Sequence, residues 1–521
     1  MRKNGVLLHV TSLPSEYGIG TMGKAAYDFV DFLKRTGQQI WQVLPLNPTG
    51  YGDSPYASYS SFAGNPYLID LDMLAEDGLL LPEEYENLEW FEEPDRVDFG
   101  KQYNQRYTVL DKAVKRFLKK PDTEYAEFAE DNAGWLEDYA LFMALKDANN
   151  GKPWLEWDEK YRQYDPLKAN EWKEEHKERM DYYKVLQYLF FKQWNALRKY
   201  ANKEGIEIMG DLPIYVSADS VDAWSNPELF VLDKDGKPSL VAGCPPDGFS
   251  ADGQLWGNPI YDWNYHKESG YDWWAKRIDH TTNMFDILRI DHFRGFDSYY
   301  AIPYGAKTAR NGNWMKGPGL ELFTTLEEKL GKRNIVAEDL GYLTDSVKQL
   351  LEDTGFPGMK ILEFAFDSRD DSGSEYLPYN YPKNSIAYAG THDNDTIRGW
   401  FESISDEDRK YAQDFMDAYN PDEYNWEMIR TVMASPADTA IVQAQDLLNL
   451  DSSARMNTPG KVGGNWTWRL LPNWNSDDIE GALKWLTSLY GRAPKKPKKA
   501  DLSAAPDTDE IAEEAVIDTE N

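Results

Sequence analysis

The clearest feature of the chain is a series of eight short apolar runs, each followed by polar, Gly or Pro residues. They occupy residues 6–10, 39–46, 206–216, 287–293, 334–339, 359–366, 385–389 and 439–444. Runs of this kind, without alternation, are typical of strands that are buried on both faces. Helical patterns lie between them, for example over residues 24–35 and 325–330. Because strands that alternate with helices form a parallel sheet, eight of them predict an α/β fold, the TIM (β/α)8 barrel.

Two connections between the predicted strands are much longer than the others. The first holds helical patterns over residues 135–147 and about 168–203, and the second is rich in Gly, Pro, Asp and Trp. Long connections without structure of their own are uncommon in compact domains. We therefore expect a mainly helical subdomain over about 73–200 and a lid-bearing subdomain over about 222–280, both inserted at the C-terminal face of the barrel strands, where barrel enzymes hold their active sites.

These insertions belong to an expected catalytic barrel of residues 1–490. Residues 491–521 contain a basic cluster and then an acidic, Ala-rich end with no apolar period. Such a composition cannot bury enough apolar surface to order itself, so we expect a disordered, charged tail.

Charge and composition restrict the function. Lys and Arg number 56 against 89 Asp and Glu, a net charge of −33, which repels phosphate backbones and anionic membrane surfaces, so we expect neither nucleic acid nor a membrane as a partner. One cysteine, Cys244, excludes an intrachain disulfide, and no apolar run is long enough for a signal peptide or a membrane span, which predicts a cytoplasmic protein. The 19 Trp and 33 Tyr suit ligands such as sugars, although a large aromatic core explains the composition more simply.

Acidic residues stand at the ends of several predicted strands. Asp211, Asp291 and Glu338 lie within the third, fourth and fifth apolar runs, where we expect the strands to end, and Asp393 follows the seventh run. Because the C-terminal ends of barrel strands converge on one pocket, these carboxylates are expected to meet. Such a set fits either a carboxylate metal site or glycoside chemistry, which uses two carboxyl groups across a C–O bond.

Arg289 favours the second chemistry. It lies two residues before Asp291, so both side chains point to the same face of the strand. A guanidinium beside a carboxylate lowers its pKa and keeps it ionised, as a nucleophile requires. A metal ligand gains little from a fixed cation at that distance. A structural salt bridge is the alternative for this pair alone, and the acids on neighbouring strand ends argue against it.

Several longer motifs resemble one known family. The chain is similar to the amylomaltases, the 4-α-glucanotransferases or disproportionating enzymes of glycoside hydrolase family 77, from about residue 5 to residue 471. The resemblance rests on Arg289-Ile-Asp-His-Phe-Arg-Gly295, Ala337-Glu-Asp-Leu-Gly341, Gly390-Thr-His-Asp-Asn394, Ser54-Pro-Tyr-Ala-Ser-Tyr-Ser-Ser-Phe-Ala-Gly-Asn-Pro-Tyr67, Ala242-Gly-Cys-Pro-Pro-Asp-Gly-Phe-Ser250, Gly253-Gln-Leu-Trp-Gly-Asn-Pro259 and Met456-Asn-Thr-Pro459.

The resemblance implies a retaining transfer of α-1,4-glucan segments from a donor maltooligosaccharide or glucan to the 4-hydroxyl of glucose or another glucan. Asp291 is then the nucleophile and Glu338 the general acid and base. Asp393 and His392 hold hydroxyls of the reacting sugar. The third strand end lacks the calcium-site motif of the wider α-amylase clan, as in the amylomaltases, so we expect no metal and no cofactor.

The remaining sugar-binding candidates are mainly aromatic. Arg289 and His292 are expected to face the reacting sugar, and Asp211 and Asn258 are included among the candidates. The Gly- and Pro-rich segment 243–257 resembles a lid and carries two rings, and the first insertion contributes two more. These four aromatic residues are Phe249, Trp256, Tyr56 and Tyr59.

Two other functions remain open at this stage. A hydrolase of the same clan would use the same catalytic residues and give the intermediate to water. A non-catalytic glucan-binding protein would use the aromatic residues alone, and three converging acids argue against it. A nucleotide-sugar transferase is disfavoured because no credible phosphate-binding loop is present. The sequence leaves open whether the protein is a monomer or a homodimer.

Overall fold

The computed structural model describes residues 2–50, 52–246, 251–341, 343–368, 371–461 and 463–494. All eight predicted strands are present in it. They are β1 (Lys3–Leu7), β2 (Ile40–Gln42), β3 (Glu207–Pro213), β6 (Ile287–Asp291), β9 (Ile335–Ala337), β10 (Gly358–Ile361), β11 (Ser385–Tyr388) and β12 (Thr439–Gln443).

These strands form one parallel sheet that curls into a barrel. Neighbouring strands pair in the order β10-β11-β12-β1-β2-β3-β6-β9. The two end strands approach each other as well, because the Ala337 amide donates to the carbonyl of Pro357, next to β10, at 3.0 Å. The predicted TIM barrel is therefore confirmed, and the C-terminal ends of its strands open on one face.

Seven of the eight strands are shorter than the apolar runs that predicted them, and β1 is as long as its run. The second run, residues 39–46, is a strand only over β2, yet Val43, Leu44 and Leu46 are still buried. The sixth run, residues 359–366, leaves the sheet after Ile361 and continues as the 3-10 helix Leu362–Phe366. Burial continues past the end of each of these strands into irregular segments at the mouth of the barrel, so apolarity alone overestimates strand length.

Helices cover the outside of the barrel. One of them, α1, buries an apolar face that includes Phe29, Val30 and Leu33. Gly37 ends α1 with φ of 76°, a left-handed conformation that favours glycine. The helices between and after the barrel strands, apart from those of the two long insertions, are α1 (Lys24–Thr36), α12 (Asp272–Met284), α13 (Leu320–Leu330), α14 (Asp345–Thr354), α15 (Ile397–Ser403), α16 (Asp406–Met416), α17 (Tyr424–Ala434), α18 (Ala444–Leu447) and α19 (Asp477–Leu489).

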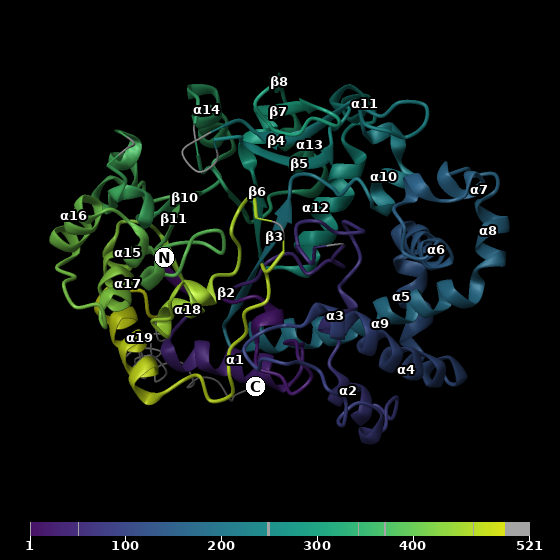
Figure 1. The fold of residues 1–521 in the computed structure, drawn as a ribbon, viewed down its shortest axis with the longest axis horizontal. Helices are drawn as coiled ribbons and strands as arrows, with labels where there is room; N and C mark the ends of the chain where they lie inside the picture. The colour runs from purple at the N-terminus through teal and green to yellow at the C-terminus, as the bar shows by residue number, and fades with distance from the viewer. Residues whose placement is uncertain are drawn as a thin grey trace, which may run out of the picture.

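The first long connection is helical, as expected. It contains α2 (Leu71–Glu76), α3 (Phe99–Lys101), α4 (Tyr107–Lys119), α5 (Glu124–Asp131), α6 (Ala133–Ala148), α7 (Glu159–Arg162), α8 (Ala169–Glu175) and α9 (Lys177–Lys203). The single helix predicted over about 168–203 is two helices, separated at His176. Figure 1 shows α4 to α9 gathered on one side of the barrel and α15 to α19 on the other.

The second long connection contributes to a small antiparallel sheet. Its elements are α10 (Val221–Ser225), β4 (Leu240–Cys244), β5 (Gln254–Pro259) and α11 (Trp263–Glu268). The sheet order is β5-β4-β7-β8, and β7 (Ser298–Pro303) and β8 (Asn313–Lys316) come from the segment after β6. Figure 1 shows this sheet at the top of the molecule, near α13. The expected boundary near residue 280 therefore cuts through a continuous sheet.

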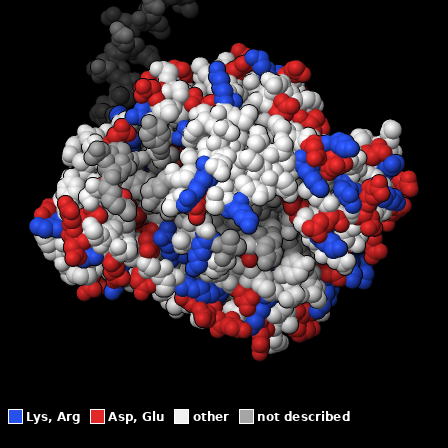
Figure 2. Space-filling view, turned by 45° about the horizontal axis from the view of Figure 1, so that its top comes forward, with Lys and Arg blue, Asp and Glu red and all other residues white. Residues whose placement is uncertain are grey.

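The core is large and aromatic. Fully buried rings include Trp41, Trp194 and Trp274. On the face shown in Figure 2, acidic side chains crowd the rim, whereas the middle consists mainly of uncharged residues with a few basic ones. Among the described helices, none combines the length and the apolarity that crossing a bilayer requires.

Candidate active site

Arg289 joins two carboxylates at the mouth of the barrel. The residue lies directly opposite Asp211 in the register of β3 and β6. Its Nη1 donates to Asp211 Oδ2 at 2.6 Å, and its Nη2 lies 2.9 Å from Asp291 Oδ1. Arg289 and Asp211 are buried, while 28% of the Asp291 side chain is exposed. The guanidinium therefore holds one oxygen of Asp291 and leaves the rest of that carboxylate accessible.

Tyr56 connects this charged group to His392. Its hydroxyl lies 2.8 Å from Asp211 Oδ2 and 2.9 Å from His392 Nε2, and the two rings stack with centroids 5.3 Å apart. Because the Asp211 carboxylate, paired with Arg289, can only accept, Tyr56 donates to it and accepts from His392. This places the proton of the neutral imidazole on Nε2. Burial lowers the pKa of His392, which keeps the ring neutral.

Glu338 directly follows β9 and lies beside Asp291. Ile290 pairs with Ala337, so Asp291 and Glu338 occupy the next positions on neighbouring strands. Parallel strands lie about 4.8 Å apart, which suits two carboxyl groups that act on one bond. Glu338 Oε2 accepts from the His292 amide at 2.6 Å, and Oε1 accepts from the Leu340 amide at 2.9 Å. His292 itself adopts φ of 52°, a left-handed backbone conformation.

The two carboxyl groups differ in their electrostatic surroundings. Burial raises the pKa of Glu338 to about 7. Burial also raises the pKa of Asp291 well above its ordinary value, and Arg289 opposes that rise while neighbouring carboxylates add to it. The expectation that Arg289 gives Asp291 a low pKa is therefore wrong, because desolvation outweighs the guanidinium.

Asp393 is held from the other side of the pocket. Asn457 Nδ2 donates to Asp393 Oδ1 at 2.6 Å, and Arg455 Nη2 donates to the Asp393 carbonyl at 2.5 Å. His392 Nε2 lies 3.5 Å from the same Oδ1. Asn457 belongs to a motif noted in the sequence, but no role was expected for it or for Arg455. Neither residue stands at a strand end, so the rule that identified the acids could not find them.

Trp256 reaches the site from β5. Its ring lies edge-on against His292, with centroids 4.8 Å apart, and 37% of the residue is exposed. Its Nε1 donates to Gln254 Oε1 at 3.1 Å. An aromatic surface is thus available beside the residue that follows Asp291.

Two other candidates, Tyr59 and Asn258, lie away from the carboxylates. The Tyr59 ring contacts α6 rather than the carboxylates, with Lys146 Nζ 4.6 Å from its centroid. Asn258 donates through Nδ2 to the Val216 carbonyl at 2.8 Å, which ties β5 to the segment after β3. Phe249 lies outside the described residues, as do residues 495–521 of the predicted tail.

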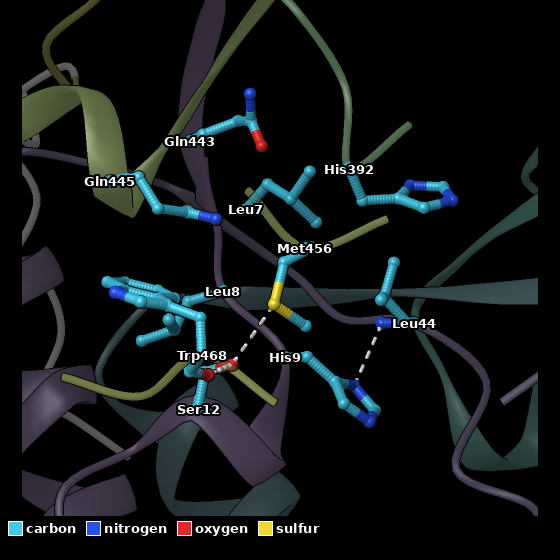
Figure 3. Close-up of a pocket in the computed structure, with 10 residues that line it drawn as sticks. All are labelled: Leu7, Leu8, His9, Ser12, Leu44, His392, Gln443, Gln445, Met456 and Trp468. Atoms are coloured by element: carbon cyan, nitrogen blue, oxygen red, sulfur yellow. Dashed lines mark hydrogen bonds between the residues drawn. The ribbon is translucent and has the colours of Figure 1, made fainter. Parts of the chain in front are cut away.

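A small cavity lies beside His392 (Figure 3). Leu7, Leu8, Met456 and Trp468 give it largely apolar walls. His9 Nδ1 accepts from the Leu44 amide at 3.3 Å, and burial lowers the pKa of His9 to about 3. A neutral His9 therefore adds no positive charge on this side of His392.

Metal binding has no evident site. Among the residues that the structure describes, no group of three His, Cys, Asp or Glu side chains is arranged to hold a metal ion. The acids of the pocket instead contact a guanidinium, backbone amides and a side-chain amide.

Comparisons with known proteins point to one family. A sequence model of the family described as 4-alpha-glucanotransferase matches residues 8–473. The 4-alpha-glucanotransferase of Clostridium butyricum is 49% identical over 487 residues, which cover 93% of this chain and 100% of the relative.

Solved structures agree with this comparison. The amylomaltase from Streptococcus agalactiae, solved in complex with acarbose, is 46% identical and superposes with a TM-score of 0.92 over 95% of this chain and 100% of that one. The amylomaltase from Corynebacterium glutamicum shares the fold at 19% identity, with a TM-score of 0.74 over 95% of this chain and 75% of that one.

Proposed function

Since the chain belongs to the 4-alpha-glucanotransferase family, we propose that it moves α-1,4-glucan segments from a donor maltooligosaccharide or glucan to the 4-hydroxyl of glucose or another glucan, with retention at the anomeric carbon. The observation that carries this proposal is the asymmetry of the two neighbouring carboxyl groups. Burial raises the pKa of both groups, but Asp291 contacts a guanidinium at 2.9 Å, whereas Glu338 accepts from the backbone amides of His292 and Leu340. One group is suited to attack and the other to carry a proton.

In the first step, Asp291 attacks the anomeric carbon of the donor. Arg289 holds Oδ1, so we assign Oδ2 as the attacking oxygen. A bond forms between Oδ2 and C1 while the bond from C1 to the 4-oxygen of the leaving segment breaks. Glu338 gives its proton to that oxygen, which would otherwise leave as an alkoxide. Of the two groups only Asp291 contacts a cation among the described residues, so the proton that the pair shares is placed on Glu338.

In the second step, an acceptor sugar replaces the leaving segment. Its 4-hydroxyl gives its proton to Glu338 and attacks C1, and the bond between C1 and Asp291 breaks. Two inversions at C1 give overall retention, and Glu338 returns to its protonated form.

His392, Asp393 and Tyr56 surround the reacting sugar in this proposal. The Asp393 carboxylate, held by Asn457, accepts from ring hydroxyls. The Tyr56 ring stacks against the His392 ring and so fixes the orientation of that imidazole. Interactions that strengthen as the sugar ring flattens accelerate the step more than uniform binding does. The Streptococcus agalactiae relative is a complex with acarbose, so we also propose that acarbose binds this pocket and inhibits the reaction.

The transfer itself is tested with maltotriose. A transferase produces glucose together with maltopentaose and longer chains, while the total concentration of reducing ends stays constant. A steady rise in reducing ends with no product longer than maltotriose would identify a hydrolase and refute the proposal. The absence of any product would leave only glucan binding.

The residue roles are tested with α-maltosyl fluoride, whose leaving group needs no proton. E338A should lose transfer from maltotriose but still release fluoride, and added azide should give α-maltosyl azide. D291N should release fluoride no faster than the background. D406N is the control, because that side chain is 99% exposed. If E338A is equally inactive with both donors, or if D291N remains active, the assigned roles are wrong.

A further inference from the structure

Glu363 lies under the turn that carries His392 and Asp393. It belongs to the 3-10 helix after β10 and is only 5% exposed. Its Oε2 accepts from Asn394 Nδ2 at 2.9 Å. Asn394 Oδ1 in turn accepts from the amide and the hydroxyl of Thr391, at 2.9 and 3.0 Å. One side chain from the sixth strand end therefore fixes the loop at the seventh.

The fit around Glu363 leaves little freedom. A Cβ atom added to Gly390 would lie 2.7 Å from Glu363 Oε1, so the glycine that precedes the turn packs directly on the carboxyl group. The amide of Glu363 also donates to the Ala389 carbonyl at 3.2 Å. The side chain and the turn are thus fitted to each other as a rigid unit.

The charges around Glu363 give it no direct counterion. Among the described residues, no basic side chain lies within ion-pair distance of it, and its Oε1 has no hydrogen-bond partner. Arg455 is the neighbouring cation, but it donates to the backbone carbonyls of Asp393 and Asn457. Asp446 and Asp395 face the same region as further acids. A carboxylate buried without a cation or several donors is very costly, whereas a neutral carboxylic acid is not.

We propose that Glu363 is a positioning residue that works as an uncharged carboxylic acid: through Asn394 it fixes the turn that presents His392 and Asp393 to the sugar. This inference rests on the proposed function for its effect on catalysis. Burial, with Asp446 adding to it, raises the pKa of Glu363 well above its ordinary value, in agreement with the geometry.

The charge state is tested by thermal unfolding, which does not depend on activity. An acid whose pKa is raised in the folded state destabilises the fold as pH rises above its unfolded value, because the unfolded chain ionises first. E363Q cannot ionise, so its melting temperature relative to wild type should increase steadily as pH rises from 5 to 8. The readout is how the difference in melting temperature between E363Q and wild type changes with pH. The new amide hydrogens shift that difference by a similar amount at each pH, so they do not affect its slope.

Glu84 provides a matched control of opposite sign. It pairs with Arg116 at 2.7 Å, and this contact lowers the pKa of Glu84 to about 2. Its ionised form therefore stabilises the fold above its unfolded pKa, and that contribution is lost as pH falls through about 2. E84Q should be less stable than wild type at pH 7, with the difference shrinking toward acidic pH. If E363Q behaves like E84Q, Glu363 is charged and the proposal is wrong.

The positioning role is tested by transfer from maltotriose. E363Q should keep kcat within about threefold of wild type, because the amide oxygen still accepts from Asn394. E363L removes that acceptor at similar volume and should lower kcat by tenfold or more. N394A removes the same hydrogen bond and also the two that Thr391 donates to Asn394, so it should lower kcat at least as much as E363L. This variant covers the case that E363L does not fold.

A failure of the proposed transfer function can be distinguished from a failure of the proposal for Glu363. A wild-type chain without transfer activity would refute the proposed function, and the pH slope of E363Q would still decide the charge of Glu363. Active wild type with E363L or N394A at full kcat would show that the turn does not depend on this contact. Equal losses in E363Q and E363L would show that the negative charge is required, which also overturns the inference.

Discussion

Replacing Arg289 by lysine tests the charge arrangement of the site most directly. The guanidinium reaches Asp211 and Asp291 at once, at 2.6 and 2.9 Å. A lysine ammonium is a compact point charge that cannot span both carboxylates with two fixed donors. R289K therefore leaves one buried carboxylate without its partner.

The size of the effect follows from the burial of this pair. Breaking a buried ion pair by removing one partner costs about 3–5 kcal/mol. If the loss falls on the attacking carboxylate, kcat/KM decreases by about 10²- to 10⁴-fold, since each 1.4 kcal/mol is about tenfold. Arg289 lowers the pKa of Asp291 against the effect of burial, so its weakening raises that pKa further. Because a nucleophile must be ionised, the acidic limb of the pH profile should move to higher pH.

The assay is kcat/KM for maltotriose disproportionation between pH 4 and 9, with thermal unfolding measured in parallel. R277K is the control, because Arg277 is also buried but donates to the backbone carbonyls of Ile214 and Pro213. R277K should lose stability rather than activity. If R289K keeps kcat/KM within tenfold of wild type and its acidic limb does not move, Arg289 has no electrostatic role in the attack.

Further predictions concern other parts of the site. The pKa of Glu338 is raised to about 7, and the acid must be protonated to act, so kcat/KM should decrease above about pH 7. A pH profile of kcat/KM that is flat to pH 9 would contradict this. Dialysis against a strong chelator should leave transfer unchanged, and activity restored by calcium or magnesium would revive a metal site. N457A should lower kcat by about 10- to 150-fold, since hydrogen bonds to charged groups contribute about 1.5–3 kcal/mol, while unchanged kcat would show that Asn457 does not hold Asp393. W256A should raise the ratio of released reducing ends to transferred glucan, measured on maltotriose.

The barrel was predictable because its signal is local and repeated. Eight buried parallel strands leave eight apolar runs, and the connections between them carry helical periods. The small antiparallel sheet gives no such signal. All four residues of β8 are exposed, and only Pro259 of the six residues of β5 is buried. Its strands also come from both sides of β6, so no single segment of the sequence indicates the sheet.

The residues of the site also differ in how well the sequence predicts them. Asp211, Arg289 and Asp291 lie on barrel strands and Glu338 directly follows one, so barrel topology alone brings them together. Asn457 contacts Asp393 across 64 positions from an irregular segment, and no local pattern marks it. Glu363 lies in an apolar run that predicts a strand, but the chain turns into a 3-10 helix after Ile361 and directs the side chain to Asn394. The acids follow from the fold, whereas the groups that hold them depend on loop geometry.

The Trp256 prediction separates transfer from hydrolysis, which the catalytic carboxylates cannot do. Water at about 55 M competes with an acceptor sugar at millimolar concentration, so transfer requires a preference of about 10⁴–10⁵, or about 6–7 kcal/mol between the two barriers. Holding the acceptor in place can supply this, because a well-oriented neighbour has a very high effective molarity. The Trp256 ring lies 4.8 Å from that of His292, the residue after Asp291, and more than a third of it is exposed, so it can stack on an acceptor glucose. W256F keeps a ring and should retain most of the preference that W256A loses. If both rates of W256A fall in parallel and their ratio stays at the wild-type value, Trp256 positions the site in general and does not select the sugar over water.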